Sequence, residues 1–322
     1  MKTTDRRSFI QGSLTGLAGL ASVPLLGSLE GCQESPTRQS TARAAALPVQ
    51  KLTDRVSVIT GAPGNLVALS SADAILLVDS GSAALAPGAR ASLASAKVST
   101  LINTHYHHDQ TGGNALFGRA GATIHAHEIT REWLATDYYV PAEDRWVKAL
   151  PKIAQPTVTF RDKADSTFGA EHVECGYLLE AHTRGDIYVF FRDSNVLAVG
   201  CVSSPARDPS LDWYAGAWIG GRADALDDLV KLANDDTKIV PAYGPVLTRA
   251  QLAGERDMMK YLFDRTTTLT DHGRDAKDML DEGVMKEVAQ KFGRTFQDPY
   301  KFLYDVSKGN WAHYTNFGGN VV

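Results

Sequence analysis

A cluster of histidines with an aspartate, His105, His107, His108 and Asp109, holds the side chains best suited to chemistry in this chain. Imidazole nitrogen and carboxylate oxygen both bind zinc and similar cations. In an extended segment, residues at i, i+2 and i+4 point to the same side. An extended chain would therefore bring His105, His107 and Asp109 together and turn His108 away. The spacing predicts a metal site rather than a solvated polar loop.

The flanking residues indicate how this cluster is positioned. Residues 98–103 form an apolar run that predicts a strand, and Gly112 and Gly113 follow the cluster. Glycine allows a sharp turn and a close approach of the backbone to a ligand. We therefore expect the candidate ligands just beyond the end of a strand.

The remaining elements are expected in two runs of strands with helices between and after them. We expect strands at residues 55–60, 66–70, 74–79, 98–103 and 122–126, then at 157–160, 172–179, 187–191, 196–199 and 238–240. We expect helices at residues 83–97, 128–135, 222–234 and 248–292, the last interrupted at His272 and Gly273. No repeat or internal domain boundary is evident after the N-terminal region.

Five blocks of sequence together resemble the motifs of the metallo-β-lactamase superfamily. They are residues 105–109, 78–81, 181–186, 199–201 and 241–245, in the expected order and with plausible gaps. The resemblance implies an α/β (α+β) fold, a four-layer αββα sandwich. It covers most of the chain after the N-terminal region. We expect one hydrolase domain over residues 47–322, whose C-terminal segment, from about 248 to 322, is helical.

The resemblance also implies a ligand set for zinc. His105, His107 and His182 would hold the first metal and leave one tetrahedral position for water, as in catalytic zinc sites. Zinc lowers the pKa of bound water to roughly 7, so that hydroxide is available at neutral pH. Asp109 would either bind a second metal or orient the attacking water as a general base.

The second metal site departs from the family pattern. Gln110 stands where many superfamily hydrolases have a further histidine, Cys201 where they have a bridging aspartate, and Tyr243 where they have a late histidine. Cysteine binds zinc well as thiolate, but glutamine and tyrosine are poor ligands. Asp109 and Cys201 would be alone unless His108, His272 or His313 joined them. We expect a well-occupied first site and a weak or absent second site.

Several other residues have two possible roles. Tyr243 could donate a hydrogen bond to a substrate carbonyl or developing oxyanion, or could simply pack beside the site. The aromatic residues between Trp213 and Trp218 could form a substrate wall or part of the core. Asp79 is expected to hold loop N–H groups rather than metal. His127 is expected to cap or pack at a helix start.

The sequence therefore predicts a metal-dependent hydrolase that attacks an ester, thioester, lactone or amide carbonyl of a small substrate. A β-lactamase is one alternative. Cys201 and an apparent export signal at the N-terminus favour it. The missing late histidine and the absence of an evident carboxylate-binding lysine near Tyr243 count against it. A non-catalytic metal-binding accessory protein is an alternative of another class. An iron-dependent sulfur dioxygenase would require an aspartate in place of Cys201.

The N-terminal region is expected to direct export rather than to fold. Arg6 and Arg7, followed by a moderately apolar stretch, resemble a twin-arginine signal. Cleavage near residue 46 is expected, and lipidation at Cys32 is the alternative route. The twin-arginine export machinery is then a partner, the periplasm is the destination, and the mature chain has no stable membrane span.

Composition limits the remaining possibilities. The chain has 43% hydrophobic residues and a net charge of −4, without a basic stripe, so nucleic acid is not an expected partner. After removal of residues 1–46, Cys175 and Cys201 are the remaining cysteines. They could pair in an oxidising compartment, but Cys201 occupies a ligand position in the family pattern.

Overall fold

The computed structural model describes residues 44–93 and 96–316, and the account below concerns that part of the chain. The expected export signal and Cys32 lie outside the described residues. None of the described helices is both long and apolar enough to cross a membrane.

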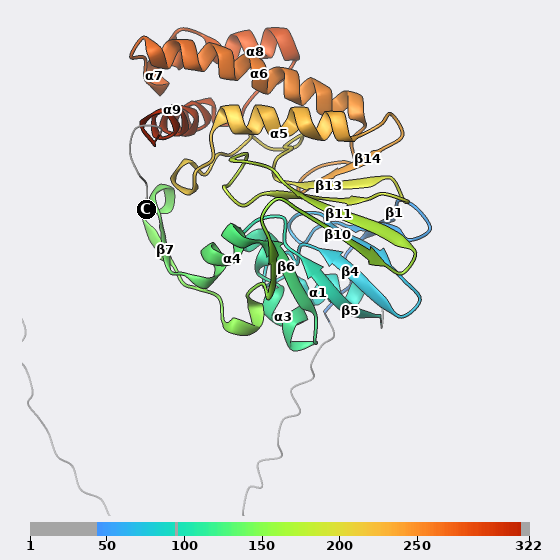
Figure 1. The fold of residues 1–322 in the computed structure, drawn as a ribbon. Helices are drawn as coiled ribbons and strands as arrows, with labels where there is room; N and C mark the ends of the chain where they lie inside the picture. Colours follow the sequence, from blue (N-terminus) through green and yellow to red (C-terminus); the bar gives the residue numbers. More distant parts are fainter. Residues whose placement is uncertain (1–43, 94–95, 317–322) are drawn as a thin grey trace, which may run out of the picture. The chain divides into compact units, whose positions relative to one another are not determined.

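A seven-stranded sheet holds the first run of predicted strands (Figure 1). Its spatial order is β1-β2-β3-β4-β5-β6-β9; β1 to β4 are antiparallel, whereas β4, β5, β6 and β9 run parallel. The strands are β1 (Val49–Lys51), β2 (Val56–Ile59), β3 (Leu66–Ser70), β4 (Ala74–Val78), β5 (Lys97–Ile102), β6 (Thr123–His127) and β9 (Val158–Phe160).

A five-stranded sheet holds the second run, in the order β10-β11-β12-β13-β14. Only β13 and β14 pair in parallel. The strands are β10 (Lys163–Phe168), β11 (Glu171–Tyr177), β12 (Ile187–Phe191), β13 (Val196–Gly200) and β14 (Lys238–Pro241). A separate hairpin of β7 (Tyr138–Val140) and β8 (Arg145–Val147) lies outside both sheets.

Alternation along the strands explains why the two sheets are stacked. In β3, Val67 and Leu69 belong to the core between the sheets, whereas Leu66 and Ala68 face the helices on the other side. Successive strand residues point to opposite faces, so a strand that is apolar at every position requires cover on both faces. The near-continuous apolar strands of this sequence therefore demand two outer layers of helices.

Those outer layers are present, and the four-layer αββα prediction is confirmed (Figure 1). The first sheet is covered by α1 (Ala86–Ser92) and α3 (Asn114–Arg119), and α4 (Glu128–Ala135) follows β6. The second sheet is covered by α5 (Ile219–Leu232) and α6 (Arg249–Asp271), against which further helices pack. These are α7 (Ala276–Asp281), α8 (Val284–Phe292) and α9 (Pro299–Asn316).

The elements that were not predicted carry weak hydrophobic signals. Strand β10 is an edge strand whose residues are mostly exposed, and Ala164 and Phe168 alone pack against the core between the sheets. The β7–β8 hairpin encloses a short 3-10 turn, η1 (Pro141–Glu143), and packs on neither sheet's core. Two other 3-10 turns are η2 (Lys152–Ala154) and η3 (Trp213–Ala215). Helix α1 is shorter than the predicted helix at residues 83–97.

Candidate metal centre

The candidate residues meet where strands of both sheets end. Asp79 follows β4, His105 follows β5, Cys201 follows β13 and Tyr243 follows β14, while His182 lies in the loop between β11 and β12. The pairs β4–β5 and β13–β14 are parallel, so their carboxyl ends lie at the same edge of their sheets, where ligands are commonly bound in α/β folds. A main-chain hydrogen bond of 2.9 Å from Ile187 N to Thr104 O joins the two sheets beside this edge.

The chain after β5 is not extended, so the predicted reason for the clustering was wrong. A helical turn, α2 (His108–Thr111), begins directly after His107 and contains Asp109. The ligand atoms of His105, His107 and Asp109 nevertheless lie within 4.8 Å of one another. The turn, rather than strand alternation, brings Asp109 back towards the two histidines.

Three imidazole rings converge at this point. The centroids of His105, His107 and His182 are 4.8–5.0 Å apart, and the rings are close to mutually perpendicular, at 79–82°. His107 Nδ1 lies 3.1 Å from His182 Nε2. His105 Nε2 is buried and has no hydrogen-bond partner among the described residues. Ligand nitrogens on a tetrahedral zinc are about 3.3 Å apart, given Zn–N bonds of about 2.0–2.1 Å, so the separation of the His107 and His182 nitrogens suits two ligands of one ion. His105 shares a possible ligand group with each of these rings, with His107 and Asp109 in one and with His182 and Cys201 in the other.

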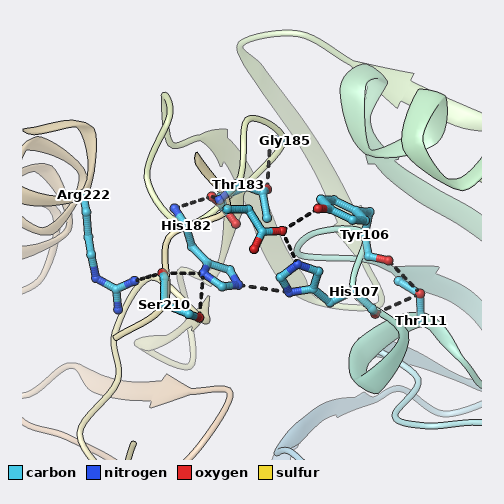
Figure 2. A network of polar contacts seen from close by, with 10 residues as sticks. Tyr106, His107, Thr111, His182, Thr183, Gly185, Ser210 and Arg222 are labelled. Carbon is cyan, nitrogen blue, oxygen red and sulfur yellow. Dashed lines mark hydrogen bonds and ion pairs between the residues drawn. The ribbon is translucent and has the colours of Figure 1, made fainter. Parts of the chain in front are cut away.

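The other nitrogen of each ring is held by the protein. His107 Nε2 lies 2.5 Å from the carboxylate of Asp212, His182 Nδ1 lies 2.9 Å from the carbonyl oxygen of Ser210, and His105 Nδ1 lies 3.0 Å from the hydroxyl of Thr104. Figure 2 shows His107 and His182 facing each other, with Ser210 beside His182. Such contacts fix the ring orientation and tautomer of metal ligands.

Asp212 is a residue that the sequence analysis missed. Its carboxylate accepts hydrogen bonds from His107 and from the Tyr106 hydroxyl. Burial raises the pKa of Asp212, but the charge and hydrogen bond of His107 outweigh it and lower the pKa. Burial likewise opposes protonation of His107, and Asp212 outweighs it and raises the pKa of that ring. No motif surrounds Asp212, so only the fold reveals its role.

The pKa of the other two rings is lowered. Burial, together with neighbouring imidazoles, holds the pKa of His105 well below its usual range and lowers that of His182 to about 4. Both rings are therefore neutral at pH 7, the form that binds metal.

Cys201 lies beside the histidines and is a free thiol. Its sulfur forms a second possible ligand group with His105 and His182, whose ligand atoms all lie within 4.8 Å. Cys175 is also free, so the disulfide alternative does not hold. Burial and the nearby carboxylate of Asp109 raise the pKa of Cys201 well above its usual value. The thiolate would therefore form only with a cation bound next to it.

The residues at the expected second metal site bind one another. The Tyr243 hydroxyl donates a hydrogen bond to the Asp109 carboxylate, and Gln110 Nε2 donates to the Tyr243 oxygen at 3.4 Å. His313 stacks on Trp218 and pairs with Glu180, while His272 is exposed at the end of α6. Neither belongs to the possible ligand groups found in the described part of the chain.

A cation that sequence inspection did not find lies against Tyr243. The guanidinium carbon of Arg207 is 3.3 Å from the centroid of the Tyr243 ring, in a cation–π contact. Arg207 belongs to the chain after Cys201, far from Tyr243 in the sequence. Arg207 therefore places a cation against Tyr243 from another loop.

Buried carboxylates hold the loops that carry the candidate ligands. Asp79 accepts hydrogen bonds from the Thr104 N–H at 2.8 Å and from its hydroxyl, as predicted. Asp186 accepts from the N–H groups of His182 at 2.7 Å and Thr183 at 2.5 Å. Burial raises the pKa of both carboxyl groups to about 7. His127 caps α4 through its side chain, also as predicted.

Glycine is required where β13 turns into the site. Gly200 has φ of +55°, and a Cβ there would lie 2.8 Å from the Thr104 hydroxyl oxygen. A larger residue would push the Cys201 loop away from the histidine loop.

A cleft of about 380 Å³ opens beside His107. Trp213 and Tyr214 line it, which favours the wall interpretation for them, whereas Trp218 packs against His313. The remaining lining residues are Tyr106, His107, His108, Asp109, Tyr138, Val140, Glu143, Arg145, Ser210, Leu211, Asp212, Lys301 and Asp305. The cleft therefore joins the histidine loop, the β7–β8 hairpin and α9.

Residues 59–244 match the sequence pattern of the metallo-beta-lactamase superfamily. The chain belongs to this superfamily. The metallo-beta-lactamase type 2 of Bacillus cereus is 24% identical over 51% of this chain and 59% of its own length. The corresponding enzyme of Bacteroides fragilis is 26% identical over 46% of this chain and 54% of its own length. The chain thus spans little more than half the length of these relatives.

Solved structures show the same fold at low identity. A metallo-beta-lactamase from Pontibacter korlensis superposes with a TM-score of 0.53 and 20% identity, over 66% of this chain and 99% of that one. A double mutant of a sec-alkyl sulfatase gives a TM-score of 0.57 and 15% identity, over 85% of this chain and 51% of that one. The second match includes more of this chain than the first.

Proposed function

We propose that this superfamily member is a zinc-dependent hydrolase of a small ester, thioester, lactone or amide. The observation that supports the proposal is the convergence of three imidazoles, with His107 Nδ1 and His182 Nε2 3.1 Å apart and His105 Nε2 buried without a partner. His105, His107 and His182 would hold the ion. A buried ring nitrogen without a partner, such as His105 Nε2, is costly unless it binds a ligand, which is a reason for a resident cation.

When bound, zinc supplies Lewis acidity and a water whose pKa is near 7. The protein residues would do the rest of the work. Asp109 would accept a proton from the attacking water, whose oxygen forms the new bond to the carbonyl carbon, and would return the proton to the leaving oxygen, sulfur or nitrogen as the bond to that atom breaks. Tyr243, which donates to Asp109, would orient that carboxylate. Asp212 would keep His107 turned so that Nδ1 faces the cation.

The proposal is tested by hydrolysis of a defined panel with zinc-loaded and metal-free protein. The panel holds an aryl ester, a thioester, a lactone, a β-lactam and, because of the sulfatase likeness, an alkyl sulfate. Zinc-dependent turnover of at least one carbonyl substrate, lost in His105→Ala, is expected. If zinc-loaded protein is inactive throughout, the non-catalytic alternative replaces the hydrolase.

A β-lactamase is the second candidate. The curated relatives are metallo-beta-lactamases, and Arg207 places a cation beside the site. The hydrogen-bonded Asp109 and Tyr243, which stand where a second metal would bind, count against it. Nitrocefin turnover faster than ester and thioester turnover would select the β-lactamase.

We also propose that the chain is exported by the twin-arginine machinery to the periplasm. The proposal depends on the sequence around Arg6 and Arg7. Fractionation of cells that make the full chain is expected to find it in the periplasm, and replacement of both arginines by lysine is expected to retain it in the cytoplasm. Lipid attachment at Cys32 would instead appear as a membrane-bound form that Cys32→Ala releases.

A further inference from the structure

The loop of residues 201–212, here called the site loop, supplies residues that lie beside the histidines and Tyr243 of the candidate centre. Cys201 opens it, Arg207 covers the Tyr243 ring, the Ser210 carbonyl faces His182, and Asp212 faces His107. The loop lies between β13 and η3 and has no helix or strand of its own. Its conformation must therefore be set by contacts from outside it.

Those contacts come from the helices that follow in the sequence. Arg222 of α5 donates to the carbonyl oxygens of Cys201 at 3.0 Å and Ser210 at 3.1 Å, so one guanidinium ties the two ends of the loop together. Figure 2 shows Arg222 reaching Ser210 beside His182. Glu255 of α6 accepts from the Ser203 hydroxyl at 2.6 Å and the Ser204 N–H at 2.8 Å.

Arg294, between α8 and α9, binds the middle of the loop. Its guanidinium donates to the carbonyl oxygens of Ser204 at 2.9 Å, Pro205 at 2.6 Å and Arg207 at 2.5 Å. These are hydrogen bonds from a charged donor, which are about twice as strong as neutral ones. Asp208 also accepts from the N–H groups of Gln297 and Asp298, just before α9.

We propose that Arg294 is a positioning residue for the metal centre. It touches none of the candidate metal ligands, but it fixes the loop segment that carries Arg207 against Tyr243 and that continues to Ser210 and Asp212. The helical C-terminal segment then helps to position the site and does more than cover the second sheet. This inference rests on the proposed function and deepens it, but the first test below measures the loop without substrate or metal, so the two can fail separately.

The test compares Arg294→Gln with Arg265→Gln. Arg265 also joins parts of the helical segment, through Glu287 of α8 and Glu282, but it does not bind the site loop. Hydrogen–deuterium exchange of the metal-free proteins is measured by mass spectrometry on peptides that cover the loop. In Arg294→Gln the loop is expected to exchange about tenfold faster or more, while in Arg265→Gln its exchange is expected to stay as in wild type. Equal loop exchange in wild type and Arg294→Gln, or equal acceleration in both variants, overturns the proposal.

A spectroscopic measurement separates positioning from simple stabilisation. In cobalt-loaded protein, visible absorption reports the arrangement of the ligands. The Arg294→Gln spectrum is expected to differ from wild type, that of Arg265→Gln to match it, and that of Arg294→Lys to lie between, because lysine lacks the planar fork of donors. If Arg294→Gln binds cobalt with an unchanged spectrum, the loop does not position the centre and the proposal is wrong.

Discussion

At the scale of single residues, the candidate centre is organised by which nitrogen of each ring is occupied. Ser210 and Asp212 take up Nδ1 of His182 and Nε2 of His107, so the remaining nitrogen of each ring faces the other. Neutral imidazole can present only one lone pair, and the tautomer decides which nitrogen carries it. The protein therefore selects the metal-binding nitrogen through contacts on the far side of the ring.

The first prediction concerns the metal content of histidine variants. Wild-type protein is expected to retain about one zinc per chain after gel filtration, whereas His182→Ala is expected to retain almost none, because a site with two remaining imidazoles binds zinc weakly. Elemental analysis measures the ratio. His172→Ala is the matched control, since His172 is an exposed strand residue that pairs with Asp165. Equal zinc in His182→Ala and His172→Ala would remove His182 from the ligand set.

The second prediction concerns a variant that puts histidine at position 243, where the family pattern has a late histidine. Tyr243→His removes the hydroxyl that donates to Asp109 and places imidazole opposite Asp109 and near Cys201, both of which bind zinc well. Zinc bound per chain is expected to rise from about one to about two.

Tyr243→Phe is the control for this change. It also frees Asp109 but adds no ligand, so its zinc content is expected to stay near one. Two tightly bound zinc ions in the wild type would contradict the explanation of the second site, whatever the variants show.

At the scale of elements, the sequence predicted the strands whose bounds are set by runs of apolar residues. Strands such as β3 and β12 were predicted with their observed bounds because they are apolar throughout and end at polar or glycine-containing turns. Strand β10 was missed, because Ala164 and Phe168 are its only apolar residues and do not make a clear hydrophobic pattern. The candidate ligands were named from motifs, but Asp212, Arg207 and Arg222 were not, because their contacts join distant loops that no local pattern records.

The third prediction concerns how the stability that Glu174 of β11 contributes to the fold depends on pH. Glu174 is desolvated, which would raise its pKa, but hydrogen bonds from Tyr188 and Arg192 outweigh this and lower the pKa. A carboxyl whose pKa is lower in the folded state stabilises the fold above its unfolded pKa, and this contribution disappears as pH falls through the folded pKa. Glu174→Gln is therefore expected to cost about 1–3 kcal/mol at pH 7 and less near pH 3.

Urea unfolding of the metal-free proteins at several pH values measures this difference. Glu128→Gln is the control, because Glu128 pairs with the largely exposed Arg161 and such pairs contribute about 0–1 kcal/mol. An equal loss of stability for Glu174→Gln at pH 7 and pH 3 would show that packing, rather than charge, explains the effect.

At the scale of the whole molecule, the candidate centre joins the two halves of the sandwich. His105 and His107 follow β5 of the seven-stranded sheet, while His182 precedes β12 of the five-stranded sheet. A cation held by all three rings exists only when both sheets are folded and stacked. Ligand binding restricted to the folded state stabilises it by mass action.

The fourth prediction follows from this bridging position. Zinc at about 1,000 times its dissociation constant adds about 4 kcal/mol of stability, which is expected to raise the melting temperature by about 5–10 °C in a domain of this size. The shift should reverse on addition of a chelator, persist in His172→Ala and nearly vanish in His182→Ala, whose remaining candidate histidines both follow β5 of one sheet. Calorimetry with and without zinc measures it. A full shift in His182→Ala would mean that the metal is held by the histidine loop alone, and that stacking of the two sheets is independent of the ion.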